Sequence, residues 1–300
     1  MAHHHDHGPQ NYNRAFIIGI ALNLAYVVIE ATYGLLAHSL ALVADAGHNL
    51  SDVLGLLLAW GASWLVRRRP TPRRTYGFRR SSVLAALFNA LFLLVAVGAI
   101  AWEAVRRLAD PAPVAGTTVI WVAVIGIVVN TATALLFFAG QKGDLNIRGA
   151  FLHMAADAGV SLGVVLAGLI ILATGWEWLD PAVSLAIVVV ILIGTWGLLR
   201  ESVDLALDAA PEDIDPVQIH AYLGEVAGVR EVHDLHIWAM STTETALTAH
   251  LIMAEQMEGD ALLRRVCDEL HDRFGIEHAT LQVERGDSAH PCPLAPAHVV

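Results

Sequence analysis

Charged side chains are scarce in this chain of 300 residues. Asp, Glu, Lys and Arg together make up 16% of the sequence, whereas 56% of the residues are hydrophobic and the mean hydropathy is +0.55. A soluble protein of this size would carry far more polar surface. The composition therefore predicts a polytopic membrane protein, surrounded by lipid over most of its length.

Cysteine is also rare, and both cysteines, Cys267 and Cys292, lie in the polar C-terminal third. A disulfide framework needs several paired cysteines and is excluded. A thiolate site for Cu(I) inside the apolar part is excluded as well, because that soft cation selects sulfur ligands. Metal chemistry within the membrane must therefore use histidine and carboxylate.

Basic residues are few from Glu201 onward, where 5 Lys and Arg face 19 Asp and Glu. Nucleic-acid binding requires clustered cations that neutralise phosphates, so no nucleic acid is expected as a partner. Residues 1–13 lack the cationic start and short apolar core of a signal peptide. They contain a His-rich tract instead, which predicts a cytoplasmic arm that captures metal, with a purification remnant as the alternative.

Six apolar segments approach or exceed the roughly 20 residues that a helix needs to span a bilayer. They cover residues 15–37, 40–66, 82–103, 117–140, 147–174 and 182–199. Seven arginines lie between the second and third segments, whereas the first-second and fifth-sixth connections contain neither Lys nor Arg. The positive-inside rule places the arginine-rich loop and both termini in the cytoplasm, although Arg106 and Arg107 on the outer side go against it.

Two histidine–aspartate pairs lie inside these segments. His48 and Asp52 are four residues apart in the second segment, and His153 and Asp157 repeat the spacing in the fifth. On a helix, residues four apart project from one face, so each pair can grip a metal ion. Two imidazole nitrogens and two carboxylate oxygens together supply the ligands of a tetrahedral zinc site.

The two pairs are also predicted to lie at the same depth. At 1.5 Å per residue, His48 and Asp52 lie roughly 14 to 20 Å from the outer end of their segment. His153 and Asp157 lie roughly 12 to 18 Å from the cytoplasmic end of theirs. In a core about 30 Å thick both pairs meet near the midplane. Simple hydrogen bonding between helices does not account for two identical pairs at one depth.

Other polar residues interrupt the apolar segments. Asp45 precedes His48 by three residues and shares its helix face, where it could relay metal or protons outward or could be interfacial. Glu30 also lies in an apolar run. Gly159 and Gly163 predict a close helix-packing face. Hydrogen bonding between helices is the role predicted for three asparagines: Asn23, Asn89 and Asn130.

The C-terminal third has the pattern of a small α+β domain. Helical spacing over 214–226 and 260–274 alternates with strands predicted over 229–240, 244–253 and 278–284, in the order α-β-β-α-β. Helices on one face of a small sheet are expected. The predicted division is a His-rich arm (1–13), a six-helix transmembrane domain (14–204), a ferredoxin-like cytoplasmic domain (205–285) and a tail (286–300).

Histidines of this domain suggest a second metal site. His233 and His236 are three apart on a strand and point to opposite faces, so both cannot join one site without distortion. His250 and His278 lie on predicted strands, which would hold them rigidly.

Three stretches resemble the cation diffusion facilitator family, and specifically its zinc-transporting branch. They are residues 45–52 (DAGHNLSD), 146–157 (NIRGAFLHMAAD) and 232–238 (VHDLHIW). Six helices followed by an α-β-β-α-β domain match as well, so the likeness spans nearly the whole chain.

The resemblance implies roles for particular residues. His48, Asp52, His153 and Asp157 would form the transport site, and the soluble domain would sense metal and hold a homodimer together. Four further residues fall at or near positions at which relatives bind zinc in that domain: His233, His250, His278 and Glu284. The second-third loop has no histidine, so a loop metal site is not supported, and His290 and Cys292 resemble a metal-binding tail.

The predicted function is export of Zn²⁺ in exchange for H⁺ across the plasma membrane, the inner membrane in a Gram-negative cell, with Cd²⁺ and Co²⁺ as further substrates. Metal binding requires neutral histidine and ionised aspartate, so it expels protons from the site. No enzymatic activity is expected. The alternatives are a membrane-embedded metalloenzyme and a metal-sensing receptor without transport.

Overall fold

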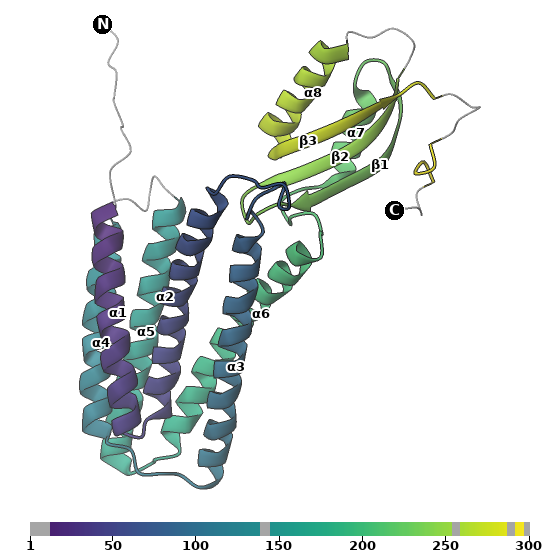
Figure 1. Cartoon of the computed structure of the whole chain (residues 1–300). Coiled ribbons are helices and arrows are strands. Elements are labelled where there is room, and N and C mark those ends of the chain that lie inside the picture. The colour runs from purple at the N-terminus through teal and green to yellow at the C-terminus, as the bar shows by residue number, and fades with distance from the viewer. Residues whose placement is uncertain (1–12, 139–144, 254–258, 287–291, 297–300) are drawn as a thin grey trace, which may run out of the picture. The chain divides into compact units, whose positions relative to one another are not determined.

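The computed structural model describes residues 13–138, 145–253, 259–286 and 292–296 (Figure 1). The predicted His-rich arm, apart from Asn13, lies outside the described residues, as does His290. The chain divides into two compact units, of which the first comprises residues 1–57 and 89–196 and the second residues 58–88 and 197–300.

Six long helices correspond to the six apolar segments. Their bounds are α1 Asn13–Leu36, α2 Leu40–Val66, α3 Ser81–Ala109, α4 Gly116–Phe138, α5 Leu145–Thr174 and α6 Leu179–Ala206. Within the described residues, five of them are long and apolar enough to cross a membrane, all except α2. The helix α2 has 27 residues, within the range of 23 to 30 residues of the other five, and carries His48 and Asp52.

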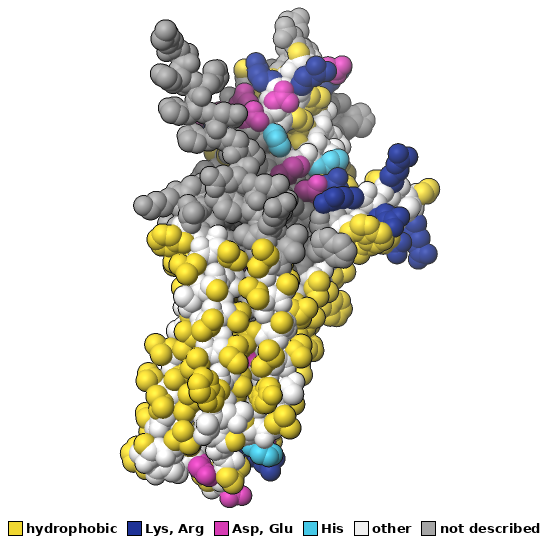
Figure 2. Space-filling view, turned by 90° about the vertical axis from the view of Figure 1, so that its left-hand side faces the viewer, with side chains coloured by type: hydrophobic (Ala, Val, Ile, Leu, Met, Phe, Trp, Pro, Cys, Tyr) yellow, Lys and Arg dark blue, Asp and Glu magenta, His cyan; other side chains and the backbone are white. Residues whose placement is uncertain are grey.

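Large apolar side chains remain exposed along these helices. Val95, Ile193 and Trp102 are 74%, 72% and 70% exposed, and Figure 2 shows hydrophobic side chains spread over the helical part on the face in view. Such a surface is unfavourable in water and favourable in lipid. The chain is therefore an integral membrane protein.

All six helices contribute to one buried core in the first unit, with Tyr26, Leu42, Val97, Val119, Val164 and Ile187 among its members. Close approach of α4 and α5 depends on two glycines: a Cβ at Gly168 would lie 2.8 Å from Ile120, and one at Gly116 would lie 3.0 Å from Leu172. The predicted packing face at Gly159 and Gly163 was wrong, because no described atom lies within 4 Å of a Cβ built at either position.

The second unit contains the α+β domain, with helices and strands in the predicted order. Its elements are α7 Pro216–Glu225, β1 Val229–Ala239, β2 Thr245–Met253, α8 Gly259–Phe274 and β3 Ile276–Glu284. The strand order is β1-β2-β3, with β1 antiparallel and β3 parallel to the central β2. The predicted fold class, six membrane helices with an αββαβ domain, is confirmed.

Both soluble helices cover the same face of this sheet. Leu247, Ala249 and Leu251 of β2 share one buried core with Leu223 of α7 and Val266 of α8. Because neighbouring residues of a strand point to opposite faces, His250 projects from the face that the helices leave open. The apolar alternation of β2 thus decides where the histidine points.

The start of α2 is held by a carboxylate from α6. Asp180 is 1% exposed, accepts a hydrogen bond from the hydroxyl of Ser39, and accepts another from the backbone N–H of Leu40 at 2.7 Å. A carboxylate at a helix N-terminus satisfies backbone donors that have no partner inside the helix and interacts favourably with the helix dipole.

We expect Asp180→Ala to lower the free energy of unfolding by about 1 to 3 kcal/mol, because Ser39 and the N–H of Leu40 lose their buried partner. Thermal unfolding of the purified protein in detergent measures this. Asp110→Ala, at an exposed aspartate, is the matched control. Equal unfolding midpoints for the two variants would contradict the assigned role of Asp180.

Candidate functional site

The two predicted histidine–aspartate pairs face each other between α2 and α5. The Nε2 atom of His153 lies 3.1 Å from Oδ2 of Asp52, and Nε2 of His48 lies 3.6 Å from Oδ1 of Asp157. Within each helix, the pairs His48–Asp52 and His153–Asp157 are 3.8 and 3.7 Å apart. Each imidazole therefore faces both carboxylates, and the two rings lie 5.8 Å apart.

These separations fit the ligand shell of one small divalent ion. Two ligand atoms bound at about 2.0 Å in a tetrahedron are about 3.3 Å apart, close to the four nitrogen–oxygen distances. Donor atoms of His48, His153 and Asp157 all lie within 4.8 Å of one another, and Asp52 joins them through its contacts with both histidines.

Burial differs across this group. The side chain of Asp157 is 3% exposed, whereas those of Asp52 and His153 are 37% and 39% exposed. Oδ2 of Asp157 and Nδ1 of His48 are buried without a hydrogen-bond partner among the described residues. Unsatisfied buried donors and acceptors are costly, and a bound cation is one way to use the free carboxylate oxygen.

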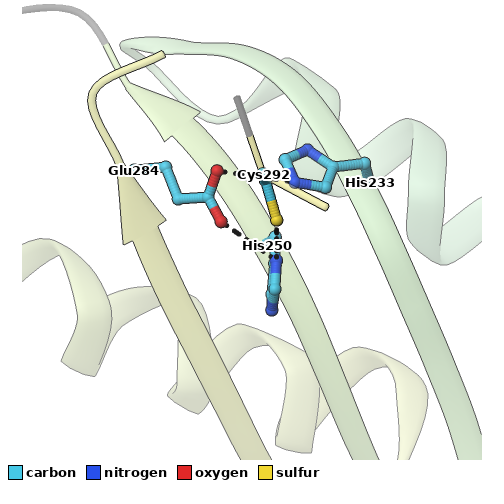
Figure 3. A group of neighbouring side chains, drawn as sticks. All are labelled: His233, His250, Glu284 and Cys292. Carbon is cyan, nitrogen blue, oxygen red and sulfur yellow. Dashed lines mark hydrogen bonds and ion pairs between the residues drawn. The ribbon is translucent and has the colours of Figure 1, made fainter. Parts of the chain in front are cut away.

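A second group of side chains gathers on the open face of the small sheet, one from each strand (Figure 3). His233 of β1 pairs directly with His250 of β2, and Glu284 lies near the end of β3. Nδ1 of His250 is 3.0 Å from Oε1 of Glu284, and Nε2 of His233 is 3.5 Å from Oε2. The strand register alone brings these three residues together.

Cys292 is the fourth member of this group. Its Sγ lies 3.5 Å from Nδ1 of His250, and Figure 3 shows it pointing toward the other three side chains. Donor atoms of all four residues lie within 4.8 Å of one another. Two imidazoles, a carboxylate and a thiol form a complete set of ligands for zinc.

Electrostatics and further contacts fit a cation here. Burial raises the pKa of Glu284, but hydrogen bonds from Gln282 and Cys292 together with the two nearby imidazoles outweigh it, so the pKa is lowered. Asp234 lies 3.4 Å from Nε2 of His250, the ring nitrogen opposite the one that faces Glu284. A carboxylate behind a histidine in this way orients the ring and makes it a stronger ligand.

The structure does not bring His278 to this group. It pairs with Ala246, four residues along β2 from His250 and thus about 13 Å away. Its ring stacks edge-on against Tyr76 at 5.6 Å. His236 also lies outside the group, because the strand register shifts between His233 and His236 and its ring contacts Asp234 at 2.8 Å.

Sequence reasoning gave no firm role to Cys292 and none to Asp234. Cys292 follows the last strand by eight residues, so spacing alone does not show that the chain returns to the sheet. Asp234 has a positive φ of 50°, an unusual conformation at the register shift, which no local pattern in the sequence reveals.

An apolar helical bundle that encloses two histidines and two aspartates defines an integral membrane protein with the ligand set of a divalent-cation site. Two protein-family models match the chain: the cation efflux transmembrane domain over residues 16–205 and the cation efflux protein cytoplasmic domain over residues 211–286. The chain belongs to this family, the cation diffusion facilitators, and the predicted membership is confirmed.

Curated relatives are similar along almost their whole length. A "cadmium, cobalt and zinc/H(+)-K(+) antiporter" of Bacillus velezensis is 34% identical over 97% of this chain and 94% of its own. The "zinc transporter ZitB" of Escherichia coli is 37% identical over 95% of this chain and 93% of its own. The "metal cation efflux system protein CzcD" of Cupriavidus metallidurans is 35% identical, over 98% and 92%.

Cobalt spectroscopy tests the ligand role of Cys292. We expect the purified protein loaded with Co²⁺ to show a thiolate-to-metal charge-transfer band that Cys292→Ser abolishes. Cys267→Ser is the matched control, because burial and the neighbouring Asp268 raise the pKa of the Cys267 thiol and keep it a poor ligand. A band that survives in Cys292→Ser would exclude this cysteine from the metal site.

Proposed function

We propose that this chain is a Zn²⁺/H⁺ antiporter that exports zinc from the cytoplasm, with His48, Asp52, His153 and Asp157 as its transport site. The observation that carries the proposal is the convergence of these four side chains inside an apolar helical bundle. Charged groups at such a depth are costly and mark ion pathways. The names of the relatives, which include zinc transporters and an antiporter, support the same function.

The donor set favours borderline divalent cations. Two nitrogens and two oxygens suit Zn²⁺, whereas Mn²⁺ prefers oxygen-rich sites and Cu(I) prefers sulfur. Cd²⁺ and Co²⁺ belong to the proposed substrates, and the name of the Bacillus velezensis relative includes both.

Proton coupling follows from the atoms involved. Without metal, the 3.1 Å contact between His153 and Asp52 is a hydrogen bond only if Nε2 carries a proton. The same Nε2 atom lies near both carboxylates and would bind the metal in the proposed site. Metal and proton therefore compete for one lone pair, so metal entry releases protons and protons promote metal release.

Exposure supports loading from the cytoplasm. In the predicted topology, Asp52 and His153 lie on the cytoplasmic side of the group, and they are its most exposed members. Asp157, toward the outer side, is closed off. Rocking of the helices around this fixed site would then expose it to the other side, as in alternating access.

We also propose that residues 14–204 form the transmembrane domain, and that the loop after α2 and the domain over residues 205–285 share the cytoplasmic side. Arg79 of that loop forms an ion pair with Glu244, and the backbone N–H of Thr242 donates to Ser82 at 3.0 Å. These contacts support the sidedness independently of the arginine count. In this proposal both termini are cytoplasmic, and residues 1–13 and 286–300 flank the two domains. We propose that the protein is a homodimer in the plasma membrane.

The group His233, His250, Glu284 and Cys292 is proposed as a zinc site of the cytoplasmic domain. The strands hold three of the proposed ligands, and a bound metal would fix the segment around Cys292 against the sheet. A metalloenzyme is the weaker alternative for the membrane site, because four protein ligands leave no open coordination position for an activated water. The second alternative is a receptor that senses metal without transporting it, and flux measurements distinguish it from a transporter.

Zinc uptake into proteoliposomes tests the transport site. We expect Asp157→Asn to reduce the flux by about 100-fold or more, because one ligand loses its charge and the affinity and proton release change together. Asp110→Asn, at an exposed aspartate between α3 and α4, is the control and retains wild-type flux. Wild-type flux in Asp157→Asn would contradict the assignment of Asp157 to the transport site.

Metal choice is tested separately. We expect His153→Asp to raise Mn²⁺ transport relative to Zn²⁺, because an oxygen ligand replaces a nitrogen and suits harder cations. Competition flux assays with the two metals measure the ratio. An unchanged ratio would mean that this histidine does not set the selectivity.

A further inference from the structure

A second pair of carboxylates lies buried in the helical bundle beside the transport site. Glu30 of α1 is 0% exposed and Asp45 of α2 is 1% exposed. The hydroxyl of Tyr26 donates to Oε1 of Glu30 at 2.7 Å, and the amide of Asn49 donates to Oε2 at 3.3 Å. The metal site as described uses neither carboxylate.

The hydroxyls that bind these two carboxylates lie together: Tyr26 donates to Glu30, Ser161 donates to Asp45, and a Cβ built at Gly126 would meet both hydroxyls. Two ionised carboxylates buried in one apolar bundle repel each other, so burial of both is favoured when one of them carries a proton. Oδ1 of Asp45 is buried and lacks a donor among the described residues, while Ser161 donates to Oδ2 at 3.4 Å. The surroundings thus provide donors for one charged carboxylate and leave room for a proton on the other.

The packing is built to hold this pair. A Cβ at Gly126 of α4 would lie 2.2 Å from the hydroxyl of Tyr26 and 2.9 Å from Oγ of Ser161, so only glycine fits there. Four helices contribute: α1 with Tyr26 and Glu30, α2 with Asp45, α4 with Gly126 and α5 with Ser161. The nearest titratable groups of the proposed metal site along the same helices are His48, three residues after Asp45, and Asp157, four residues before Ser161.

The pair also lies on one side of the metal site. Asp45 precedes His48 by three residues, roughly 4.5 Å along α2, and Ser161 follows Asp157 by four residues, roughly 6 Å along α5. Because α2 and α5 run in opposite directions through the membrane, both displacements point the same way. In the proposed topology that direction is outward.

We propose that Glu30 and Asp45 form a proton-holding pair, and that a counter-transported proton passes through this pair between the outer side of the membrane and the metal site. The inference rests on the proposed antiport. When the metal leaves outward, the shared proton moves to Asp157 or His48, and the pair takes another from the outer aqueous phase. Each step breaks one O–H bond and forms one O–H or N–H bond.

Reconstituted wild type, Glu30→Gln and Asp45→Asn are compared for zinc flux with and without an imposed proton gradient. We expect the gradient to accelerate wild-type flux, and this acceleration to fall by about tenfold or more in both variants. Zinc affinity, measured by calorimetry in detergent, stays at the wild-type value. Variants that keep the full acceleration overturn the proposal.

Two further variants separate proton transfer from packing. Asn130→Ala removes a polar side chain of α4 that is equally buried, with 0% exposure, and cannot titrate, so the acceleration should persist. Tyr26→Phe keeps the ring and removes the donor to Glu30, and should shift the pH at which flux is half-maximal. A pH profile identical to the wild type in Tyr26→Phe counts against the pair, and it does so even if the carboxylate variants do not fold.

Infrared difference spectroscopy tests the shared proton without transport. The metal-free wild type minus Glu30→Gln should show the C=O band of a protonated carboxylic acid, and absence of that band overturns the shared proton. Failure of this inference and failure of the proposed function give different results. If the wild type shows no zinc flux, the proposed function is wrong, and if its flux does not respond to the proton gradient, antiport is wrong. If the gradient accelerates flux in the wild type and equally in both carboxylate variants, only the role of Glu30 and Asp45 is wrong.

Discussion

The cost of placing carboxylates among apolar helices governs the membrane part of this protein. Asp157, Asp45 and Glu30 are each nearly or fully buried, where lone negative charges are strongly disfavoured. Each therefore needs a cation, a proton or a donor close by. The histidines of the proposed transport site and the hydroxyl and amide donors around Glu30 meet that need at two neighbouring levels of the bundle. In the proposed antiport, a metal ion and protons would take turns as the counter-charge.

The α+β domain gathers its candidate metal ligands in a different way. Three of them come from adjacent strands, the fourth is Cys292, and the apolar alternation that builds the core beneath the sheet sends His250 to the opposite face. Geometry there depends on strand register rather than on helix spacing. Metal at this site would link β1, β2 and β3 to the segment around Cys292, whereas the membrane site links only two helices.

The sequence predicted much of this because its signals are local. Apolar length specified the helices, four-residue spacing specified which side chains share a helix face, and alternation specified the strands. What escaped prediction depends on the return of distant segments: the approach of Cys292 to His250, the turn of Asp234 behind that ring, and the separation of His278 from it by strand register. Gly159 and Gly163 matched a packing pattern, yet close approach occurs at Gly116 and Gly168, because the pattern does not identify the facing helix.

The carboxylate that begins α2 has a mechanical meaning. Asp180 of α6 accepts hydrogen bonds from Ser39 and from the first N–H groups of α2, so the N-terminal ends of these two helices are joined by buried hydrogen bonds. A tilting motion that opens this end of the bundle must therefore move the N-terminal ends of α2 and α6 together, or must first break these hydrogen bonds. The hinge of such a motion then belongs elsewhere along α2 and α6, away from their joined ends.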